Sequence, residues 1–506
     1  MNNTNLNKLK PGSSIYLMGI CGTAMASLAG LLQAKGFLIS GSDSAAYPPM
    51  SDQLKNLGIS VKIPYSANNL STKPDLIIVG NVISKNFTEA VEMQKLKIPY
   101  VSLPQAISSF FIKDKKSIII AGTHGKTTTT SLMSWVFQSC NLKPSFLIGG
   151  IAKNFSQSFL EQNGNYFIIE GDEYDTAFFD KGPKFLHYKP NLVILTGIEF
   201  DHADIYESLD QILESFKKLV ELIPENGLLI VNSDDKNIKK LLTLSNIKSK
   251  IVGFGFNKID KMEFISNYYQ VSDYQYTKTF QNIKIKNINK NKQVNLQSTL
   301  FGKHNILNNL AVWVLCSELI DNKEIKISQD KVLKAMQEFK GIKRRQDIFF
   351  KTNNITFIED FAHHPTAVNL TLDAVQNQYF SNKKIDTNNG RVFAVFEPRS
   401  ATSRRDTFQK DFVLAFDKAD KVIIAQAYYQ EKITEQDRFS SSKLVNDINN
   451  IDDINYKDCK KAKYIKDTDS IIKFLQENLK ANDVVVIMSN GSFDNIYKKI
   501  QEKFSK

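Results

Sequence analysis

The chain has 506 residues, of which 42% are hydrophobic and 23% charged, which is the composition of an ordinary globular protein. At roughly 100–200 residues per domain, this length predicts about three domains, and the composition excludes a coiled coil or a largely disordered chain. The formal net charge of +12 comes from lysines spread along the whole sequence. Because no arginine-rich stripe is present, we expect no nucleic-acid partner, and part of the charge favours polyanionic small substrates.

The sequence shows no recognisable targeting signal and no cysteine motif. Residues 1–10 are polar and Asn-rich, and no apolar run approaches the roughly 20 residues that a membrane span needs. The four cysteines are scattered without a CxxC pair, so we expect reduced thiols rather than zinc ligands. They are Cys21, Cys140, Cys316 and Cys459. These features predict a cytoplasmic protein without a signal peptide or membrane span.

Short apolar runs alternate with amphipathic stretches of helix length along the whole chain. This alternation predicts an α/β fold with mostly parallel sheets. Residues 251–300 alternate polar and apolar side chains and predict a β-rich insertion, whereas the polar run 376–389 predicts a mobile loop. We expect buried strands at residues 14–20, 76–80, 118–121, 166–169, 192–196, 228–231, 392–396, 422–425 and 484–488.

Two breaks in this pattern predict the domain boundaries. One is the charged turn at residues 113–116, and the other lies at Gly341, where a basic triplet follows a long helical stretch. The predicted domains are therefore residues 1–114, 115–340 and 341–506.

The first motif follows the first predicted strand. Gly19 and Gly22 form a GxxG turn before a helix, and Ser42 and Asp43 follow the next strand. The full GxGxxG fingerprint of dinucleotide-binding folds is missing. The pattern therefore indicates a nucleotide-type ligand other than NAD.

The second motif is the segment GTHGKTTTT at residues 122–130, which joins an apolar strand to a helix. Backbone N–H groups in such a turn bind phosphate oxygens, and the helix N-terminus adds partial positive charge. Lys126 can neutralise the β- and γ-phosphates, and the Thr127 hydroxyl can bind Mg²⁺. The match to GxxxxGK[ST] is incomplete, because Ile120 stands where the first glycine is expected. We nevertheless interpret the segment as a phosphate-binding loop rather than a structural turn.

Two acidic segments follow, each at the end of a predicted strand: EGDEYD at residues 170–175 and EFDHAD at residues 199–204. Mg²⁺ prefers carboxylate oxygens beside substrate phosphates, and open α/β sheets bind ligands at the strand ends. Alone, each segment is more often a solvated loop; together with the phosphate loop they predict a metal site. Five of the six histidines fall in such motifs, and His187 does not, so we expect His187 to be structural.

A third group of motifs lies near the second boundary. Asn305 and Asn308 lie on one face of a predicted helix, and their amides suit the edge of adenine; helix capping is the alternative. The basic triplet 343–345 offers guanidinium groups for phosphate. Asp360 ends a predicted strand and could hold ribose hydroxyls.

As a set, the motifs GxxG…GSD, GTHGKTTT, ExDExD, ExDHxD, GKHNxxN, GxxRR and DxxHHP resemble the Mur ligases of peptidoglycan synthesis over nearly the whole chain. The resemblance implies a Rossmann-like N-terminal domain for a UDP-sugar, a central P-loop ATPase domain with a parallel sheet, and a Rossmann-like C-terminal domain for the incoming amine. It implies an ATP-dependent carbon–nitrogen ligase with an acyl-phosphate intermediate and two Mg²⁺ ions. Such an enzyme serves cell-wall synthesis, and hence cell shape and division.

Site residues follow from the resemblance, position by position. The implied catalytic residues are Lys126, Glu170, His202 and Arg345, and the implied metal ligands are Thr127, Glu170 and His202. The implied ATP site comprises Gly122, Thr123, His124, Gly125, Lys126, Thr127, Thr128, Asn305, Asn308, Arg345 and Asp360. The implied UDP-sugar site comprises Gly19, Gly22, Ser42, Asp43, Asn81 and Ser84, and Arg399, Arg404 and Asn490 are candidates for the amine substrate.

Within the family, GTHGKT and HHP are typical of the branch that acts on UDP-N-acetylmuramate itself. One kind of member adds L-alanine, and another adds the recycled tripeptide L-alanyl-γ-D-glutamyl-meso-diaminopimelate. Residues 178–188 and the segment FEPRS at 396–400 resemble the tripeptide-adding kind, which we therefore favour, with L-alanine as the alternative. Folate polyglutamylating enzymes lack the N-terminal module, and a regulator without ligase activity would not keep all the motif residues. The oligomeric state stays open.

Overall fold

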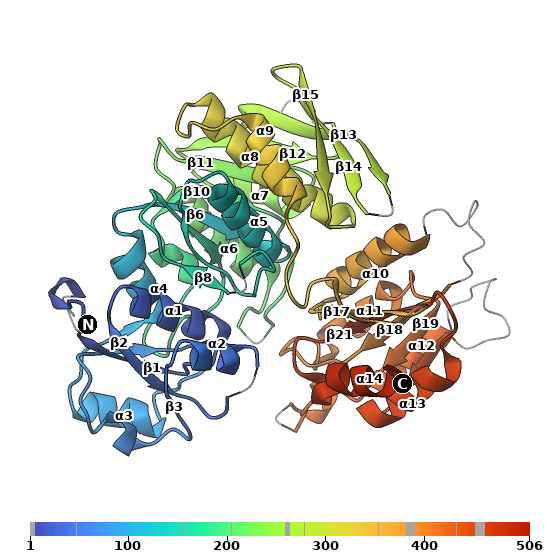
Figure 1. Ribbon diagram of the computed structural model, residues 1–506, viewed down its shortest axis with the longest axis horizontal. Coiled ribbons are helices and arrows are strands. Elements are labelled where there is room, and N and C mark those ends of the chain that lie inside the picture. The colour runs from blue at the N-terminus through green and yellow to red at the C-terminus, as the bar shows by residue number, and fades with distance from the viewer. Residues whose placement is uncertain are drawn as a thin grey trace.

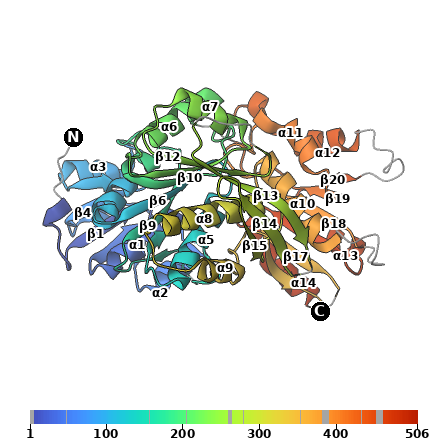
Figure 2. The same ribbon diagram turned by 90° about the horizontal axis from the view of Figure 1, so that it is seen from above.

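The computed structural model describes residues 6–46, 48–155, 157–203, 205–258, 264–277, 279–352, 354–380, 390–431, 433–450 and 461–505. Three sheets follow one another along the chain, with helices on their faces (Figure 1). Seen from above, the part of the chain that contains the second sheet lies between the other two (Figure 2). The α/β fold class is therefore confirmed. Among the described residues, no helix is long and apolar enough to cross a membrane.

The first sheet is Rossmann-like. Its five strands are all parallel in the order β3-β2-β1-β4-β5. Ile15 and Leu17 of β1 and Ile78 of β4 are fully buried, as expected for strands covered on both faces. The strands are β1 Ser14–Met18, β2 Leu38–Ser42, β3 Val61–Lys62, β4 Leu76–Val79 and β5 Tyr100–Ser102, and the helices are α1 Thr23–Ala34, α2 Met50–Asn56, α3 Thr88–Lys95 and α4 Leu103–Ile107.

The central sheet has ten strands in the order β15-β14-β13-β12-β11-β10-β6-β9-β7-β8, and the stretch from β13 to β7 is parallel. Its strands are β6 Lys116–Ala121, β7 Ser145–Leu147, β8 Phe159–Leu160, β9 Tyr166–Gly171, β10 Pro190–Leu195, β11 Leu228–Asn232, β12 Lys250–Gly255, β13 Asn267–Tyr276, β14 Gln281–Asn287 and β15 Lys292–Ser298. Its helices are α5 Lys126–Ser139, α6 Leu209–Glu221, α7 Lys236–Leu244, α8 Lys303–Asp321 and α9 Gln329–Gln337.

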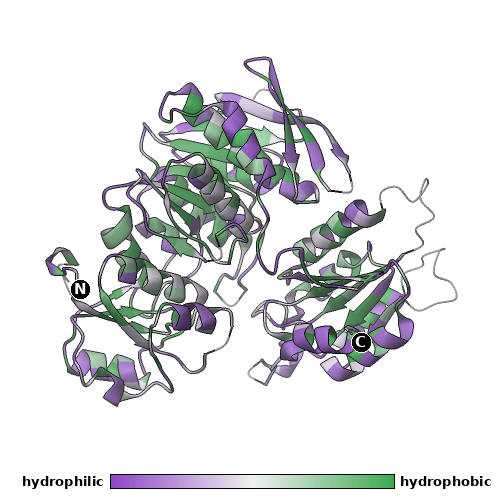
Figure 3. Ribbon diagram, in the orientation of Figure 1, coloured by the Kyte–Doolittle hydropathy of each residue, from purple (hydrophilic) through white to green (hydrophobic). Residues whose placement is uncertain are grey.

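The predicted β-rich segment at residues 251–300 is rich in strands, but it is not a separate insertion. β12 and β13 continue the parallel sheet, and β14 and β15 extend it as an antiparallel meander. Figure 3 shows hydrophobic strands at the centre of each sheet and a more hydrophilic antiparallel end at β13–β15. The alternation in the sequence therefore reflects strands with one solvent-facing side.

The third sheet has six strands in the order β16-β17-β21-β18-β19-β20, and only β16 is antiparallel to its neighbour. Its strands are β16 Asp347–Lys351, β17 Thr356–Asp360, β18 Val392–Phe396, β19 Lys421–Ile424, β20 Ala462–Tyr464 and β21 Val484–Met488. Its helices are α10 Pro365–Phe380, α11 Asp411–Ala415, α12 Ser441–Asn449, α13 Thr468–Asn478 and α14 Ile496–Phe504.

Each of the nine predicted strands is present within one or two residues at its ends. The predicted loop at residues 376–389 is wrong at its start, because α10 continues to Phe380. Val375 is buried in the core, while the polar Gln376 donates a hydrogen bond of 2.7 Å to the Lys418 carbonyl. These polar residues therefore form the outer face of a helix. Residues 381–389 lie outside the described part of the chain.

Candidate functional site

The predicted phosphate loop joins β6 to α5 at the carboxyl edge of the central sheet. Gly122 and Gly125 have φ values of +128° and +82°. A Cβ atom on Gly122 would lie 2.4 Å from Thr196 Oγ1, and one on Gly125 would lie 2.5 Å from Asn308 Oδ1. Only glycine therefore fits at both positions, and the N-terminus of α5 is left open to an anion.

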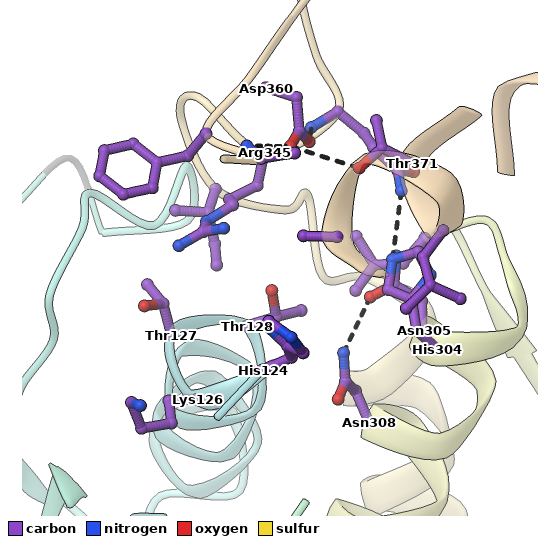
Figure 4. A pocket seen from close by; sticks show the side chains of 18 of the residues that line it. His124, Lys126, Thr127, Thr128, His304, Asn305, Asn308, Arg345, Asp360 and Thr371 are labelled. Carbon is purple, nitrogen blue, oxygen red and sulfur yellow. Dashed lines mark hydrogen bonds between the residues drawn. The ribbon is translucent and has the colours of Figure 1, made fainter. Parts of the chain in front are cut away.

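A cavity of about 620 Å³ adjoins this loop and is lined from both sides by the central sheet and the third sheet. It contains Lys126, Asn308, Arg345 and Asp360, which the sequence places as far as 234 residues apart (360 − 126). In Figure 4 the Arg345 guanidinium extends from the opposite wall toward the N-terminus of α5, where Lys126 and Thr127 lie. The cavity thus gathers the predicted phosphate-binding groups around one space.

Lys126 is held by the protein's own acceptors. Its Nζ donates to the Gly122 carbonyl at 2.6 Å and to Glu173 Oε2 at 3.0 Å. Burial lowers the pKa of Lys126, but the surrounding carboxylates, led by Glu173, outweigh burial and raise the pKa above its ordinary value. Lys126 is therefore a fixed positive charge at the base of the loop.

Glu170, at the end of β9, faces the phosphate loop. Its Oε2 accepts a hydrogen bond of 2.9 Å from Thr127 Oγ1, and its Oε1 accepts one of 2.5 Å from the Gly149 backbone N–H. Burial and the neighbouring Asp172 raise the pKa of Glu170. A hydroxyl and a carboxylate side by side at the start of a phosphate-binding helix are oxygen donors that fit Mg²⁺. Gly149 was not anticipated, because a backbone donor leaves no sequence signal.

His202 lies next to Glu173, whereas the sequence predicted Glu170 as the acid that shares a metal ion with it. Its Nε2 is 3.6 Å from Glu173 Oε1, and its ring packs on Tyr174 with centroids 5.0 Å apart. His202 also has a left-handed backbone, with φ +55°. Glu173 therefore stands between Lys126 and His202, a position that the ExDExD motif contained but did not distinguish from its other acids.

Asn305 and Asn308 lie on α8 beside the cavity, and both are buried. Asn305 Nδ2 donates to the Phe301 carbonyl at 2.8 Å, and Asn308 Nδ2 donates to Asn305 Oδ1 at 3.0 Å (Figure 4). Neither side chain caps the helix, because the N-cap residue is Gly302. The two amides form one polar group, and Asn308 Oδ1 contacts the phosphate loop at Gly125.

Arg345 and Asp360 come from the chain around the third sheet. Arg345 stacks on Phe361, with its guanidinium carbon 4.8 Å from the ring centroid. Asp360 accepts hydrogen bonds from the backbone N–H groups of Gln346 at 2.7 Å and Ala362 at 2.8 Å. Burial raises the pKa of Asp360. Asp360 therefore holds the loop that carries Arg345.

Glu199 is the main site residue that the sequence interpretation did not single out. Its Oε2 lies 3.4 Å from His124 Nε2 and 3.8 Å from His364 Nδ1, and it accepts a hydrogen bond of 2.8 Å from Thr366 Oγ1. Burial raises the pKa of Glu199, but these imidazoles and the hydroxyl outweigh burial and lower the pKa to about 2. Two signals in the sequence could have found it: Glu199 is the first acid of ExDHxD, and its neighbour His364 belongs to the HHP motif.

The N-terminal candidates lie at the carboxyl ends of β1, β2 and β4. Asp43 accepts from the Cys21 N–H at 2.9 Å and from the Tyr65 hydroxyl at 3.3 Å. Ser42 is buried, and its hydroxyl donates to Glu89 Oε2 at 2.5 Å. The hydroxyl therefore points into the protein interior. The remaining candidates are Gly19 and Gly22, which precede α1, and the exposed Asn81 and Ser84, which follow β4.

The C-terminal candidates surround the ends of β18 and β21. Arg399 stacks on Tyr428, with its guanidinium carbon 3.8 Å from the ring centroid. Arg404 Nη1 donates to the Tyr429 carbonyl at 2.9 Å. Asn490 Oδ1 is buried and has no hydrogen-bond partner among the described residues. These groups offer positive charge and an unsatisfied amide.

Comparisons with known proteins agree along the chain. Residues 14–114 match "Mur ligase family, catalytic domain", residues 120–316 match "Mur ligase middle domain" and residues 344–491 match "Mur ligase, glutamate ligase domain". The UDP-N-acetylmuramate–L-alanyl-γ-D-glutamyl-meso-2,6-diaminoheptandioate ligase of Escherichia coli is 31% identical over 97% of this chain and 98% of its own. The UDP-N-acetylmuramate–L-alanine ligase of Clostridium kluyveri is 31% identical over 94% of this chain and 95% of its own.

Solved structures give the same picture. The murein peptide ligase of Psychrobacter arcticus superposes with a TM-score of 0.70 at 29% identity, covering 97% of this chain and 98% of its own. The UDP-N-acetylmuramate–alanine ligase of Thermotoga maritima gives a TM-score of 0.76 at 22% identity, covering 97% and 99%. The second likeness concerns the fold alone.

Proposed function

This chain belongs to the Mur ligase family, whose members are ATP-dependent ligases that form amide bonds in peptidoglycan synthesis, and we propose that it joins UDP-N-acetylmuramate to L-alanyl-γ-D-glutamyl-meso-diaminopimelate. The observation that supports the ligase activity is that the phosphate loop and Arg345 face each other across one cavity. We assign residues 1–114 to the UDP-sugar, residues 115–340 to ATP and residues 341–506 to the amine.

The tripeptide is supported by the relatives and by charge. The Escherichia coli and Haemophilus influenzae relatives whose names include the tripeptide are 31% and 32% identical over 97% of this chain. The tripeptide carries several carboxylates, whereas L-alanine carries one. Arg399 and Arg404, with the unsatisfied amide of Asn490, suit the more highly charged substrate.

The proposed reaction has two steps. A carboxylate oxygen of the sugar nucleotide attacks the γ-phosphorus of ATP, so that ADP leaves and an acyl phosphate forms. The amine nitrogen of the tripeptide then attacks the acyl carbon, and phosphate leaves with loss of one amine proton. Carboxylate and triphosphate repel one another, so positioning and neutralisation of charge must lower the barrier.

Residues of this chain supply that charge. Lys126 would exchange its hydrogen bonds to Glu173 and the Gly122 carbonyl for phosphate oxygens, while the start of α5 binds phosphate through its N–H groups. Arg345, presented by the loop that Asp360 holds, would bind the γ-phosphate from the other wall of the cavity. Asn305 and Asn308 would border the adenine, and Asp360 the ribose.

Mg²⁺ is the metal that the family uses, and we propose two ions. When bound, Mg²⁺ neutralises developing charge on the phosphates. Thr127 and Glu170, whose oxygens lie 2.9 Å apart, would hold one ion against the triphosphate. Glu170 and His202 would hold the other near the sugar carboxylate.

Addition of L-alanine is the second candidate, because relatives named for that activity are also 31% identical over 94% of this chain. Overall identity does not separate the two activities. Both would use the same ATP site and differ only in the amine.

The test offers the purified protein UDP-N-acetylmuramate, Mg²⁺ and ATP with either the tripeptide or L-alanine. Release of ADP and the mass of the product are measured together. We expect ADP and amide product with the tripeptide and little with L-alanine. A preference for L-alanine would replace the proposed substrate, and no ADP-linked product with either amine would contradict the ligase assignment of the site.

A further inference from the structure

We propose that His124, Glu199 and His364 form a transition-metal site that ties the chain around the third sheet to the central sheet. His124 belongs to the phosphate loop, Glu199 follows β10, and His364 directly precedes α10. Their ligand atoms all lie within 4.8 Å of one another. This site is separate from the Mg²⁺ ligands proposed above and does not rest on the choice of amine.

The distances are close to those of a bound ion. A tetrahedral ion about 2.0–2.1 Å from each ligand atom requires ligand atoms roughly 3.3 Å apart. Glu199 Oε2 lies 3.4 Å from His124 Nε2 and 3.8 Å from His364 Nδ1. Side-chain shifts of a few tenths of an ångström bring both contacts to the required separation, and the two imidazole nitrogens, which lie within 4.8 Å of each other, must approach one another as well.

The ligand types select the metal. Two imidazoles and one carboxylate favour Zn²⁺, Co²⁺ or a similar first-row ion, whereas Mg²⁺ prefers oxygen ligands. His124 Nε2 is buried and makes no hydrogen bond, although it lies 3.4 Å from Glu199 Oε2. A metal ion between this nitrogen and the carboxylate would give both atoms a partner. Three protein ligands leave a fourth position for water or a phosphate oxygen.

Neighbouring groups already orient two of the ligands. The Thr366 backbone N–H donates to His364 Nδ1 at 3.3 Å, so this nitrogen carries a lone pair, which a metal would take in place of that hydrogen bond. Thr366 Oγ1, which donates to Glu199 Oε2 at 2.8 Å, would orient the carboxylate as outer-sphere groups do in metal sites.

A metal here would have a mechanical consequence. His364 precedes α10, which packs with the third sheet, whereas His124 and Glu199 follow strands of the central sheet. The ion would therefore hold the two walls of the ATP cavity together. The open fourth position would face the cavity that all three residues line. A tightly bound transition ion would therefore slow the opening that nucleotide exchange needs.

Co²⁺ is the probe for this site, because its visible absorption reports tetrahedral coordination. The full-length protein is titrated with Co²⁺ in the presence of excess Mg²⁺, which occupies the oxygen-rich sites. We expect a saturable tetrahedral spectrum at one equivalent, and a loss of affinity of roughly 100-fold or more in His364→Gln, given that even outer-sphere changes cost about 10–100-fold. His187→Gln is the matched control. His187 does not belong to the cluster, and its Nε2 lies 3.1 Å from Asp180 Oδ2.

A second variant separates loss of a ligand from loss of folding. His364→Cys replaces one metal ligand by another, and it should keep a Co²⁺ spectrum and gain a sulfur-to-cobalt charge-transfer band. An unchanged Co²⁺ affinity in His364→Gln, or the absence of that band in His364→Cys at saturating Co²⁺, would overturn the proposal. An octahedral spectrum in the wild-type protein would overturn it as well.

Discussion

Thr366 Oγ1 donates a hydrogen bond of 2.8 Å to Glu199 Oε2, although 167 residues separate them in the chain. The contact joins the start of α10 to the loop after β10, and so it closes one edge of the cavity that Lys126 and Arg345 line. A hydrogen bond to a charged group contributes roughly 1.5–3 kcal/mol. It is therefore strong enough to influence how the two sides of the cavity meet.

Thr366→Val removes this hydrogen bond while it keeps the shape of the side chain. We expect the KM for ATP to rise about ten-fold, because closure of the cavity becomes less favourable. Steady-state kinetics with varied ATP measures the effect. Thr434→Val is the control, because the exposed Thr434 hydroxyl also bonds a carboxylate, Asp437, but does so within a single 3-10 turn. Equal KM values for both variants would show that the contact has no role in closure.

Lys126→Ala removes the buried cation of the phosphate loop. We expect kcat to fall by at least about 100-fold, the usual cost of losing one group that stabilises charge in the transition state. Release of ADP in the complete reaction is the measurement, and circular dichroism checks the fold. Lys95→Ala, at a lysine whose side chain is 72% exposed, should keep wild-type activity. Near-normal turnover of Lys126→Ala would remove the central assumption about the loop.

Arg344 and Arg345 are neighbours with different surroundings. Arg344 Nε donates to Glu359 at 2.7 Å and its Nη2 donates to the Gly491 carbonyl at 2.7 Å, whereas Arg345 extends into the cavity. We expect Arg344→Ala to lower the free energy of unfolding by roughly 2–3 kcal/mol through loss of charged hydrogen bonds. Arg345→Ala should instead lower kcat with little change in stability. Urea unfolding and kinetics of both variants test this, and the reverse pattern would contradict it.

Gly125→Ala tests the fit between the phosphate loop and α8. The new Cβ would lie 2.5 Å from Asn308 Oδ1, in a backbone with φ +82°. We expect affinity for ATP to fall at least about ten-fold, because the loop or Asn308 must move. Gly58→Ala is the matched control, since Gly58 has φ +69° with no atom within 4 Å of the added Cβ. Binding of a fluorescent ATP analogue should change only in the first variant; equal binding would rule out the steric argument.

His304 predicts a pH dependence of stability. Burial, with the nearby His124 and Arg345, lowers its pKa from 6.5 to about 4. Between these pH values the unfolded chain binds a proton that the folded chain does not. Acidification from pH 7 to pH 5 should therefore remove about 2 kcal/mol of the free energy of unfolding through His304 alone, and this contribution is fully present only above pH 6.5.

The measurement compares urea midpoints at pH 7 and pH 5 for the wild-type protein, His304→Gln and His187→Gln. The His304→Gln midpoint should shift less with pH than the wild-type midpoint, because the titrating group is gone. The His187→Gln protein should keep the wild-type shift attributable to His304. Identical shifts in all three proteins would mean that His304 titrates normally.

Much of the architecture was predictable because buried parallel strands leave a local pattern. The apolar run at Ile118–Ile120 and its counterpart at Val484–Met488 are covered on both faces, so every position is hydrophobic. The polar end of α10 was misassigned for the opposite reason. A helix face turned to solvent has the composition of a loop, and only the burial of Val375 on its other side distinguishes the two.

The sequence by itself determined the buried strands and the glycine turn between β6 and α5, because each depends on neighbours in the chain. Tertiary structure alone decided which of the clustered acids contacts which partner: Glu173 binds Lys126, Glu170 meets Thr127, and Glu199 reaches Thr366 across the cavity. These pairings depend on how separate sheets pack, and on backbone groups such as the Gly149 N–H that are identical in every residue. Spacing within a motif carries no information about such distances.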